Sequence, residues 1–311
     1  MKKFLLVALC LVLSLSVFCA CSTEAFLIEG LSYLFENISV SQEYVSKISS
    51  VSTEEYPLRA HFIDVGQADS TFLELPDGKT MLIDAGNPEN ADEITEYINS
   101  LGYEKLDYVV ATHPHADHIG GMAEVLKEFG AEKIFMPKKE STTNVFENMI
   151  DVIAEKEIPI YSAKKGVVIC ETDEYKINIL SPEDKNYDNL NNYSAVVKIT
   201  YGESEYLFMG DAEKKIETPL KKLNIQADVL KLGHHGSSTS SGQEFLKKVN
   251  PKYTVISCGE DNSYGHPHDE VVKRLKRLNL KTFRTDLEGC IFIACDKNEN
   301  FVVEREADYD Y

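Results

Sequence analysis

The alternation of apolar and polar positions predicts an α/β protein from residue 58 onward. Short apolar runs typical of strands come first, and later ones alternate with amphipathic segments of helical period. The strand-like runs cover residues 58–65, 70–75, 79–86, 107–112, 133–137, 175–180, 194–202, 205–211, 227–233, 253–259 and 289–295. The helical segments cover residues 89–102, 119–129, 142–157, 212–223, 241–249 and 267–278. A Pro-Asp-Gly turn at residues 76–78 predicts a hairpin. Early strands, interleaved helices and late strands fit two packed sheets with helices outside.

The N-terminus follows a different pattern. Lys2 and Lys3 precede an apolar run over residues 4–18, which is the order of a signal peptide. That run is shorter than the roughly 20 residues of a spanning helix. An alanine before Cys21 and a serine after it are typical of a lipoprotein cleavage site, so residues 1–20 are predicted to be a lipoprotein-type signal peptide. We therefore expect an exported protein, lipid-anchored at the outer face of the bacterial cytoplasmic membrane. An uncleaved anchor and simple secretion are the alternatives.

Residues 21–57 are rich in serine and glutamate and only partly amphipathic. They are predicted to form a tether with one possible helix, which lifts the following domain off the membrane. The domain itself is assigned to residues 58–311, a length that is ample for a large apolar core.

The sequence THPHADHIGG, at residues 112–121, carries the candidate chemistry. It places His113, His115, Asp117 and His118 directly after a strand-like run. Imidazole and carboxylate groups are ligands for a divalent metal such as zinc, and burying four of them without partners is costly. In an extended segment the two histidines at 113 and 115 point the same way and can hold one metal. The aspartate and histidine at the start of the next helix can reach a second metal. Two metals about 3.5–4 Å apart can share a water and turn it into a hydroxide.

The order His-x-His-x-Asp-His after a strand resembles the metallo-β-lactamase superfamily. The sequences DVGQADS, NNYSAVV, GDAE, HHGSSTS, YGHP and RTDLEG are most similar to the soluble C-terminal domain of ComEC-type competence proteins, which act in DNA uptake. The resemblance covers residues 58–305 and implies a metallo-β-lactamase-like four-layer αββα sandwich. It also implies that Asp211 bridges the two metals and that Asp64 orients the histidine loop from behind.

One departure from the family pattern affects the metals. Many members have a third histidine for the first metal, but this chain has none between His118 and His234. The matching place is the segment 191–194, where Asn192 and Ser194 are candidates for substrate binding. A site with fewer imidazoles and more oxygen ligands tolerates manganese better. We therefore expect two divalent metal ions, with zinc as the first choice and manganese as the alternative.

The remaining histidines leave one choice open. Either His235 or His266 completes the second metal site, and the order of the strands does not separate them. A histidine that is not a ligand can donate a proton to the leaving group, so His234 and His266 are candidate catalytic residues together with Asp117. His268 is predicted to start a helix.

Three further residues are candidates for holding a phosphate. Ser237 and Ser238 can offer hydroxyl and backbone donors at a helix start, although a plain helix cap explains them equally well. Arg284, in the sequence RTDLEG, is the third.

The four cysteines beyond Cys21 are interpreted as small buried residues. Cys170, Cys258, Cys290 and Cys295 show no CxxC spacing, so a structural zinc site is not expected among them. A disulfide outside the cell is the alternative reading.

The net charge of −19 bears on the substrate, because an acidic surface weakens non-specific binding to a polyanion. The basic run at residues 273–277 lies on a predicted amphipathic helix and is expected to face water.

The first hypothesis is a metal-dependent phosphodiesterase or nuclease at the cell surface. The second is a hydrolase of small esters, lactones, thioesters or lactams, which the acidic charge favours. The third is a non-catalytic binding protein, against which the metal motifs argue. The partners expected are nucleic acid or a small molecule, and the membrane; no protein partner is indicated.

Overall fold

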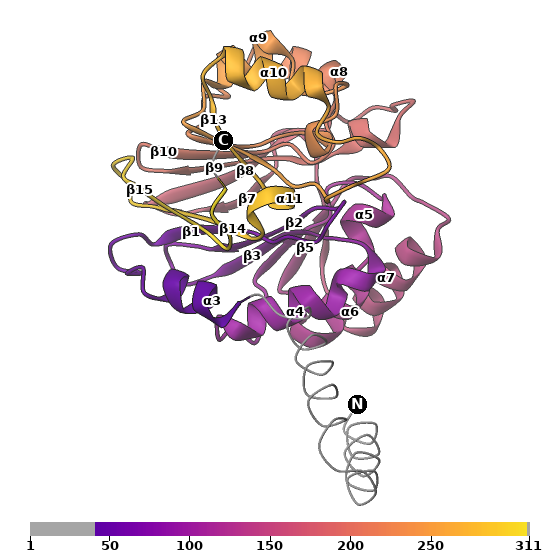
Figure 1. The fold of residues 1–311 in the computed structure, drawn as a ribbon. Coiled ribbons are helices and arrows are strands. Elements are labelled where there is room, and N and C mark those ends of the chain that lie inside the picture. Colours follow the sequence, from indigo (N-terminus) through magenta and orange to yellow (C-terminus); the bar gives the residue numbers. More distant parts are fainter. Residues whose placement is uncertain (1–40, 310–311) are drawn as a thin grey trace, which may run out of the picture. The chain divides into compact units, whose positions relative to one another are not determined.

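The computed structural model describes residues 41–309; the predicted signal peptide and the first part of the predicted tether lie outside them. Two sheets pack face to face between two layers of helices (Figure 1), which confirms the predicted four-layer αββα sandwich. The first sheet has the strand order β15-β14-β1-β2-β3-β4-β5-β6, and the second has the order β13-β12-β11-β10-β9-β8-β7.

The strands are short, and each sheet contains one run of parallel strands. The first sheet is formed by β1 (Leu58–Phe62), β2 (Ser70–Glu74), β3 (Thr80–Ala85), β4 (Tyr108–Val110), β5 (Lys133–Met136), β6 (Ile160–Ser162), β14 (Ile291–Cys295) and β15 (Phe301–Arg305). The second is formed by β7 (Val168–Glu171), β8 (Tyr175–Ser181), β9 (Val196–Tyr201), β10 (Ser204–Phe208), β11 (Val229–Lys231), β12 (Tyr253–Ile256) and β13 (Lys281–Arg284). Strands β3 to β6 are parallel, as are β10 to β13, so their carboxyl ends share an edge in each sheet. The C-terminal hairpin β14–β15 returns to the first sheet beside β1.

The helices divide between the two outer faces (Figure 1). The first sheet is covered by α3 (Gln42–Ser49), α4 (Ala91–Ser100), α6 (Met122–Phe129) and α7 (Asn144–Glu155), and the second by α8 (Lys214–Leu220), α9 (Gln243–Val249) and α10 (Asp269–Arg277). The shorter elements are α5 (Ala116–Ile119), α11 (Thr285–Glu288) and the 3-10 turns η1 (Pro88–Asn90), η2 (Leu190–Tyr193) and η3 (His234–Gly236). Within residues 41–309, no helix is long and apolar enough to cross a membrane.

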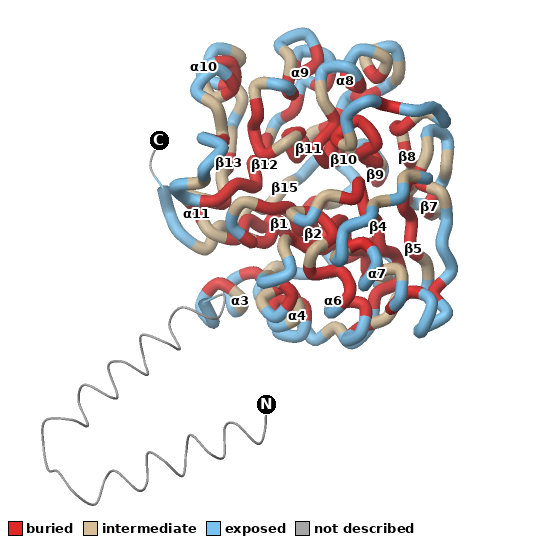
Figure 2. Tube along the Cα trace, turned by 90° about the vertical axis from the view of Figure 1, so that its right-hand side faces the viewer, coloured by how far each residue is buried: buried red, intermediate tan, exposed pale blue. Residues whose placement is uncertain are grey.

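Three apolar layers hold the sandwich together. One lies between the first sheet and its helices, one between the two sheets, and one between the second sheet and its helices. Strands β1, β2 and β3 are buried at every position because both of their faces are covered. Figure 2 shows the buried residues in the middle of the molecule and the exposed ones on its outer helices and loops. Of the cysteines, Cys258, Cys290 and Cys295 are buried free thiols, and Cys170 is a half-buried one.

Helix α3 belongs to the packed domain, which corrects the prediction that residues up to 57 form a tether. Its Tyr44 and Ile48, four residues apart on one helical face, are buried in the apolar layer of the first sheet. The buried Arg59 guanidinium donates to the carbonyl oxygens of Ile48, at 2.9 Å, and Val51, at 2.8 Å. The chain therefore joins the domain by Gln42.

We expect Ile48→Ala to lower the free energy of unfolding by about 3 kcal/mol, because it empties a fully buried position. Urea denaturation followed by circular dichroism measures this. The matched control is Ile160→Ala on edge strand β6, where the side chain is 51% exposed and a change below about 0.5 kcal/mol is expected. Equal effects of the two substitutions would show that α3 does not pack as described.

Candidate metal centre

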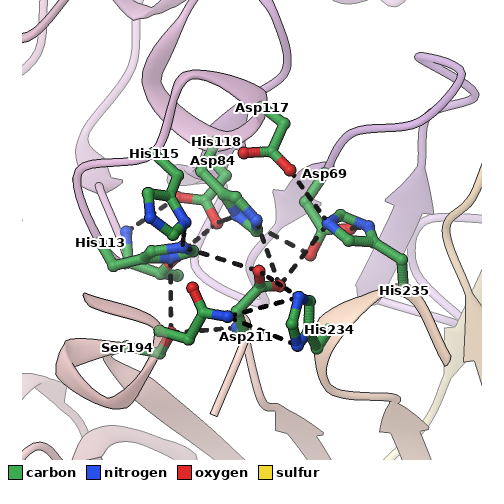
Figure 3. Close-up of polar contacts among 12 residues, drawn as sticks. Asp69, Asp84, His113, His115, Asp117, His118, Ser194, Asp211, His234 and His235 are labelled. Atoms are coloured by element: carbon green, nitrogen blue, oxygen red, sulfur yellow. Dashed lines mark hydrogen bonds and ion pairs between the residues drawn. The ribbon is translucent and has the colours of Figure 1, made fainter. Parts of the chain in front are cut away.

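The predicted ligands meet where loops leave the carboxyl ends of the parallel strands. His113 and His115 follow β4, and Asp117 and His118 lie on the short helix α5. Asp211 follows β10 on the opposite sheet. Figure 3 shows these side chains pointing toward one another, together with His234 and His235 of η3, which follows β11. Loops on a rigid scaffold thus carry the candidate chemistry, as the sequence order predicts.

Asp117, His118, Asp211 and His235 form one group of potential ligands. Their ligand atoms lie within 4.8 Å of one another. His118 Nε2 and Asp211 Oδ1 are 3.2 Å apart, yet neither atom has a hydrogen-bond partner, and the buried His235 Nε2 has none either. Buried polar atoms without partners are rare and need an explanation. A divalent cation between them satisfies all three, so this residue set fits a metal.

The tautomers of two of these histidines support the same conclusion. His118 Nδ1 donates to Asp84 Oδ2 at 2.7 Å, and His235 Nδ1 donates to the carbonyl oxygen of Ser257 at 3.0 Å. Each bond fixes the proton on Nδ1 and leaves the Nε2 lone pair directed into the cluster. This is the arrangement of metal-ligating histidines. Sequence order left His235 and His266 open as the last ligand; the cluster contains His235.

His113, His115 and Asp211 form the second group. His113 Nε2 lies 3.0 Å from His115 Nδ1 and 3.7 Å from Asp211 Oδ2. Asp211 therefore presents Oδ1 to one group and Oδ2 to the other, which is the geometry expected of a bridging carboxylate.

His234 supplies a third imidazole near the second group. Its Nε2 lies 3.7 Å from Asp211 Oδ2, and its Nδ1 lies 3.0 Å from Thr239 Oγ1. The sequence led us to expect fewer imidazoles and more oxygen ligands at this metal; the additional imidazole near it comes from later in the chain. Asn191, in the segment where a histidine was missing, contacts the His234 ring through Nδ2 at 3.3 Å.

Asp84, rather than Asp64, orients the histidine loop. The fully buried Asp84 accepts from Thr112 N at 2.8 Å, from Thr112 Oγ1 at 2.7 Å and from His118. Asp64 instead accepts from the backbone N–H of Gly66, and it lines a separate acidic cavity. The run LIDAG around Asp84 was recognised as a strand, but nothing in its apolar pattern marked the aspartate as a support.

The sequence analysis also did not predict a buried ion pair that lies next to His235. Lys231 Nζ lies 2.8 Å from Asp69 Oδ1, and that oxygen lies 3.2 Å from His235 Nδ1. Both residues are buried. The available signal was a lysine at the end of the apolar strand run DVLKLG, because a lysine is rarely buried unless it is paired.

The backbone at the centre adopts uncommon conformations. Asp84, His234 and His235 have φ of 59°, 54° and 50°, in the left-handed region that favours glycine. Such strain persists where the surrounding structure over-determines it, and it clusters at functional sites. Here two consecutive residues of this kind turn both imidazoles of η3 toward Asp211.

The charges of the centre suit a cation. Burial lowers the pKa of His113 well below its usual value, and the neighbouring His118 lowers it further, so this ring is neutral and free to ligate. Burial also acts to lower the pKa of His118, but Asp211, Asp84 and Asp117 outweigh it and raise that pKa well above normal. The carboxylates thus hold a positive charge at this position, and a metal can take the place of the proton.

The cavity above the centre measures about 310 Å³. Its lining residues are Gln67, His115, Ala116, Asp117, Asn191, Asp211, His234, His235, Tyr264 and His266. Gln67 Nε2 donates to His266 Nδ1 at 3.3 Å, which leaves the proton of a neutral ring on Nε2. Burial, followed by the charges of His235 and His234, lowers the pKa of His266 to about 4, so the ring is neutral at neutral pH. As predicted, His268 is the N-cap of α10.

Several predicted substrate-binding residues have other partners. Ser194 Oγ accepts from Asp211 N at 3.0 Å and contacts His113 Nδ1 at 3.4 Å, so it supports the ligands from behind. Asn192 donates to Glu213 at 2.8 Å, and its neighbour Asn191 faces the cavity instead.

The predicted phosphate-binding residues also lie away from the cavity lining. Ser237 Oγ accepts from Thr239, and the Ser238 N–H donates to His268 Nδ1 at 2.9 Å. Arg284 pairs with Asp286 and lines a different cavity, beside α10. Their proposed role at a phosphate is therefore not supported by this geometry.

Two ligand groups that share one carboxylate, at the loop edge of an αββα sandwich, define the class of metal-dependent hydrolases. The comparison with known families agrees: residues 63–260 match the Metallo-beta-lactamase superfamily. The chain belongs to this superfamily, as its motifs predicted. The roles of the individual ligands stay predictions.

The curated relatives confirm the resemblance to ComEC-type competence proteins. The chain is 33% identical over 248 residues to ComE operon protein 3 of Bacillus subtilis (strain 168), a match that covers 74% of this chain and 32% of that protein. It is 32% identical over 233 residues to Competence protein ComA of Neisseria gonorrhoeae, with coverage of 73% and 31%. The matched region thus spans about a third of the length of these relatives.

A solved structure shows the same fold. A metallo hydrolase from the hyperthermophilic archaeon Ignicoccus hospitalis superposes with a TM-score of 0.51 at 19% identity, over 79% of this chain and 98% of that one. At this identity the likeness concerns the fold alone.

Proposed function

We propose that this chain is a two-metal phosphodiesterase that acts on nucleic acid. The observation that carries the proposal is the shared Asp211 between two ligand groups, beneath a cavity whose lining also offers the uncharged donors Gln67, Asn191 and Tyr264. Two bound divalent metals would supply Lewis acidity and a nucleophilic water at neutral pH. The name of one relative, Competence protein ComA, supports nucleic acid as the substrate.

Residues of the chain itself can orient the phosphate and donate a hydrogen bond to the leaving oxygen. Asn191 Nδ2 faces the cavity and can donate to a phosphate oxygen. His266, held by Gln67 with its Nε2 proton directed away from that contact, can donate a hydrogen bond to the leaving oxygen. His234 is half-buried at the same wall, within reach of Asp211 and the cavity, and stands as the second candidate donor.

The second candidate function is hydrolysis of a small ester, lactone, thioester or lactam. An acidic cavity of about 540 Å³ shares Gln67 with the metal cavity, and its lining includes Asp64, Glu89, Glu93 and Asp286. Together with the net charge of −19, these carboxylates repel a long polyanion. A non-catalytic binding role on the same fold is the third candidate.

Location at the cell surface is a further part of the proposal. It rests on the lysines, the apolar run and Cys21 at the start of the sequence, which lie outside the described residues. In a bacterial host, Cys21→Ser is expected to abolish incorporation of labelled palmitate and release the protein from the membrane fraction. Unchanged labelling would contradict lipidation at this cysteine.

The deciding experiment uses the full-length protein loaded separately with zinc and with manganese. We expect one of the two forms to cut labelled single-stranded DNA, and Asp117→Ala to remove this activity and one metal. Asp188→Ala is the matched control, because its carboxylate is fully exposed and forms a surface ion pair with Lys215. Protein that holds both metals but cuts a lactone or ester and no phosphodiester would establish the second function. Protein that holds both metals and hydrolyses neither would establish the third.

A further inference from the structure

An aromatic stack leads from the surface to the metal centre. The Tyr264 ring lies 5.6 Å from the His266 ring at an interplanar angle of 19°, and the His266 ring lies 6.2 Å from that of His235 at 21°. His235 belongs to the group of potential ligands that also contains Asp117, His118 and Asp211. Each ring is therefore nearly parallel to the next, and Tyr264 is at the exposed end of the series.

Tyr264 is highly exposed and also lines the cavity above the metal centre. Its side chain is 67% exposed, the highest value among the large apolar residues exposed in the described part of the chain. Tyr161, another of these, is 44% exposed on edge strand β6 and does not line the metal cavity. Tyr264 lines that cavity, so its ring borders the space where a substrate would sit.

The loop that carries Tyr264 is held by hydrogen bonds. Asn262 Oδ1 accepts from His266 N at 2.9 Å, and Asn262 Nδ2 donates to the carbonyl oxygen of Gly259 at 2.9 Å. Gly259 N in turn donates to Gln67 Oε1 at 3.2 Å. The loop therefore presents the tyrosine in a fixed position, and little conformational entropy is lost when a flat ligand stacks on it.

We propose that Tyr264 is a base-stacking residue that receives an unpaired nucleobase of the substrate beside the metal centre. The inference rests on the proposed phosphodiesterase function and narrows its substrate to single strands and unpaired ends. Stacking uses the uncharged face of a base, so it contributes affinity without the basic groove that most nucleic-acid clamps need. This accounts for a nucleic-acid substrate on a chain with a net charge of −19. In a duplex the base faces are already covered by neighbouring bases, so a double strand gains nothing from this ring.

The test compares Tyr264→Ala with Tyr264→Trp and with Tyr161→Ala, an exposed tyrosine away from the centre. Each full-length protein is loaded with metal and given a single-stranded oligonucleotide or the same strand with abasic residues. We expect Tyr264→Ala to lower kcat/KM about 10- to 100-fold on the base-bearing strand and to leave the abasic strand unchanged. Tyr264→Trp and Tyr161→Ala should stay within about 2-fold of the unsubstituted protein, because the first keeps a stacking surface and the second lies outside the site.

Binding is measured in parallel, by fluorescence anisotropy of a labelled phosphorothioate strand that resists cleavage. This measurement tests the stacking role of Tyr264 separately from the phosphodiesterase function. If the protein cleaves nothing but binds the base-bearing strand more tightly through Tyr264, the phosphodiesterase function fails and the stacking site stands. If cleavage occurs and Tyr264→Ala lowers it equally on both strands, or on neither, the stacking site is wrong and the function stands. If the unsubstituted protein binds both strands equally, the stacking site is also overturned.

Discussion

Replacing Asp211 by asparagine is expected to strip metal from both ligand groups and to abolish hydrolysis. Its two carboxylate oxygens face different groups, with Oδ1 3.2 Å from His118 Nε2 and Oδ2 3.7 Å from His113 Nε2. The amide is nearly the same size but carries no charge and offers only one acceptor oxygen. Loss of a residue that merely supports a ligand typically costs 10- to 100-fold, so we expect a loss of activity on the order of 1,000-fold or more for a shared ligand.

The number of metals bound per chain tests the bridging role of Asp211 without the need for a substrate. Mass spectrometry of the dialysed protein should find about two metals per unsubstituted chain and less than one in Asp211→Asn, since both groups lose the same ligand. Asp188→Asn, at a fully exposed position, serves as the matched control and should keep both metals. If Asp211→Asn lost only one metal, Asp211 would belong to a single group and would not bridge.

The cluster of candidate metal ligands was predictable because its signal is local. His113, His115, Asp117 and His118 lie within six positions, directly after an apolar strand run. Each later ligand also follows a strand, so the order of elements places all of them at one edge of the sheets. The core was predictable for a similar reason, since strands β1 to β3 lie in short runs rich in apolar residues, and the structure buries them at every position.

The supports of the centre were not predictable because they depend on contacts between distant segments. Asp84 meets His118 across 34 positions, and Lys231 meets Asp69 across 162. An aspartate at the end of a strand looks the same in sequence whether it holds a histidine, as Asp84 does, or lies elsewhere, as Asp64 does. The proximity of His234 to the second ligand group likewise depends on the left-handed backbone of η3, which no spacing rule reveals.

Edge strands were missed for a different physical reason. Strands β6, β7, β13 and β15 were absent from the prediction, and each lies at or next to the end of a sheet. On β6 and β7, the apolar side chains of Ile160, Tyr161 and Val168 are exposed, so these short segments lack the long buried apolar run that marks a central strand. Pairing with an existing sheet, rather than burial, makes these segments strands.

Lys231→Met is expected to lower the free energy of unfolding by about 3–5 kcal/mol, because it leaves the buried Asp69 carboxylate without its ammonium partner. Lys231 Nζ lies 2.8 Å and 2.9 Å from the two Asp69 oxygens, and both side chains are buried. A loss of this size is a large share of the 5–15 kcal/mol that holds a typical domain folded. Since Asp69 also contacts His235, the variant should bind its metals more weakly as well. Urea denaturation of the metal-free protein measures the first effect, and metal titration calorimetry the second.

A double variant separates the effect of the Lys231 charge from the effect of packing its alkyl chain. Lys231→Met combined with Asp69→Asn removes both charges, and we expect it to recover most of the lost stability because a neutral buried pair costs much less than a lone carboxylate. Lys252→Met is the matched control, since its ammonium pairs with Asp228 and Glu299 at the surface, and such exposed pairs are worth about 1 kcal/mol or less. If the double variant were as unstable as Lys231→Met alone, the lysine would act through the packing of its alkyl chain between the sheet and the loop after β11. In that case Asp69 would be positioned by other contacts.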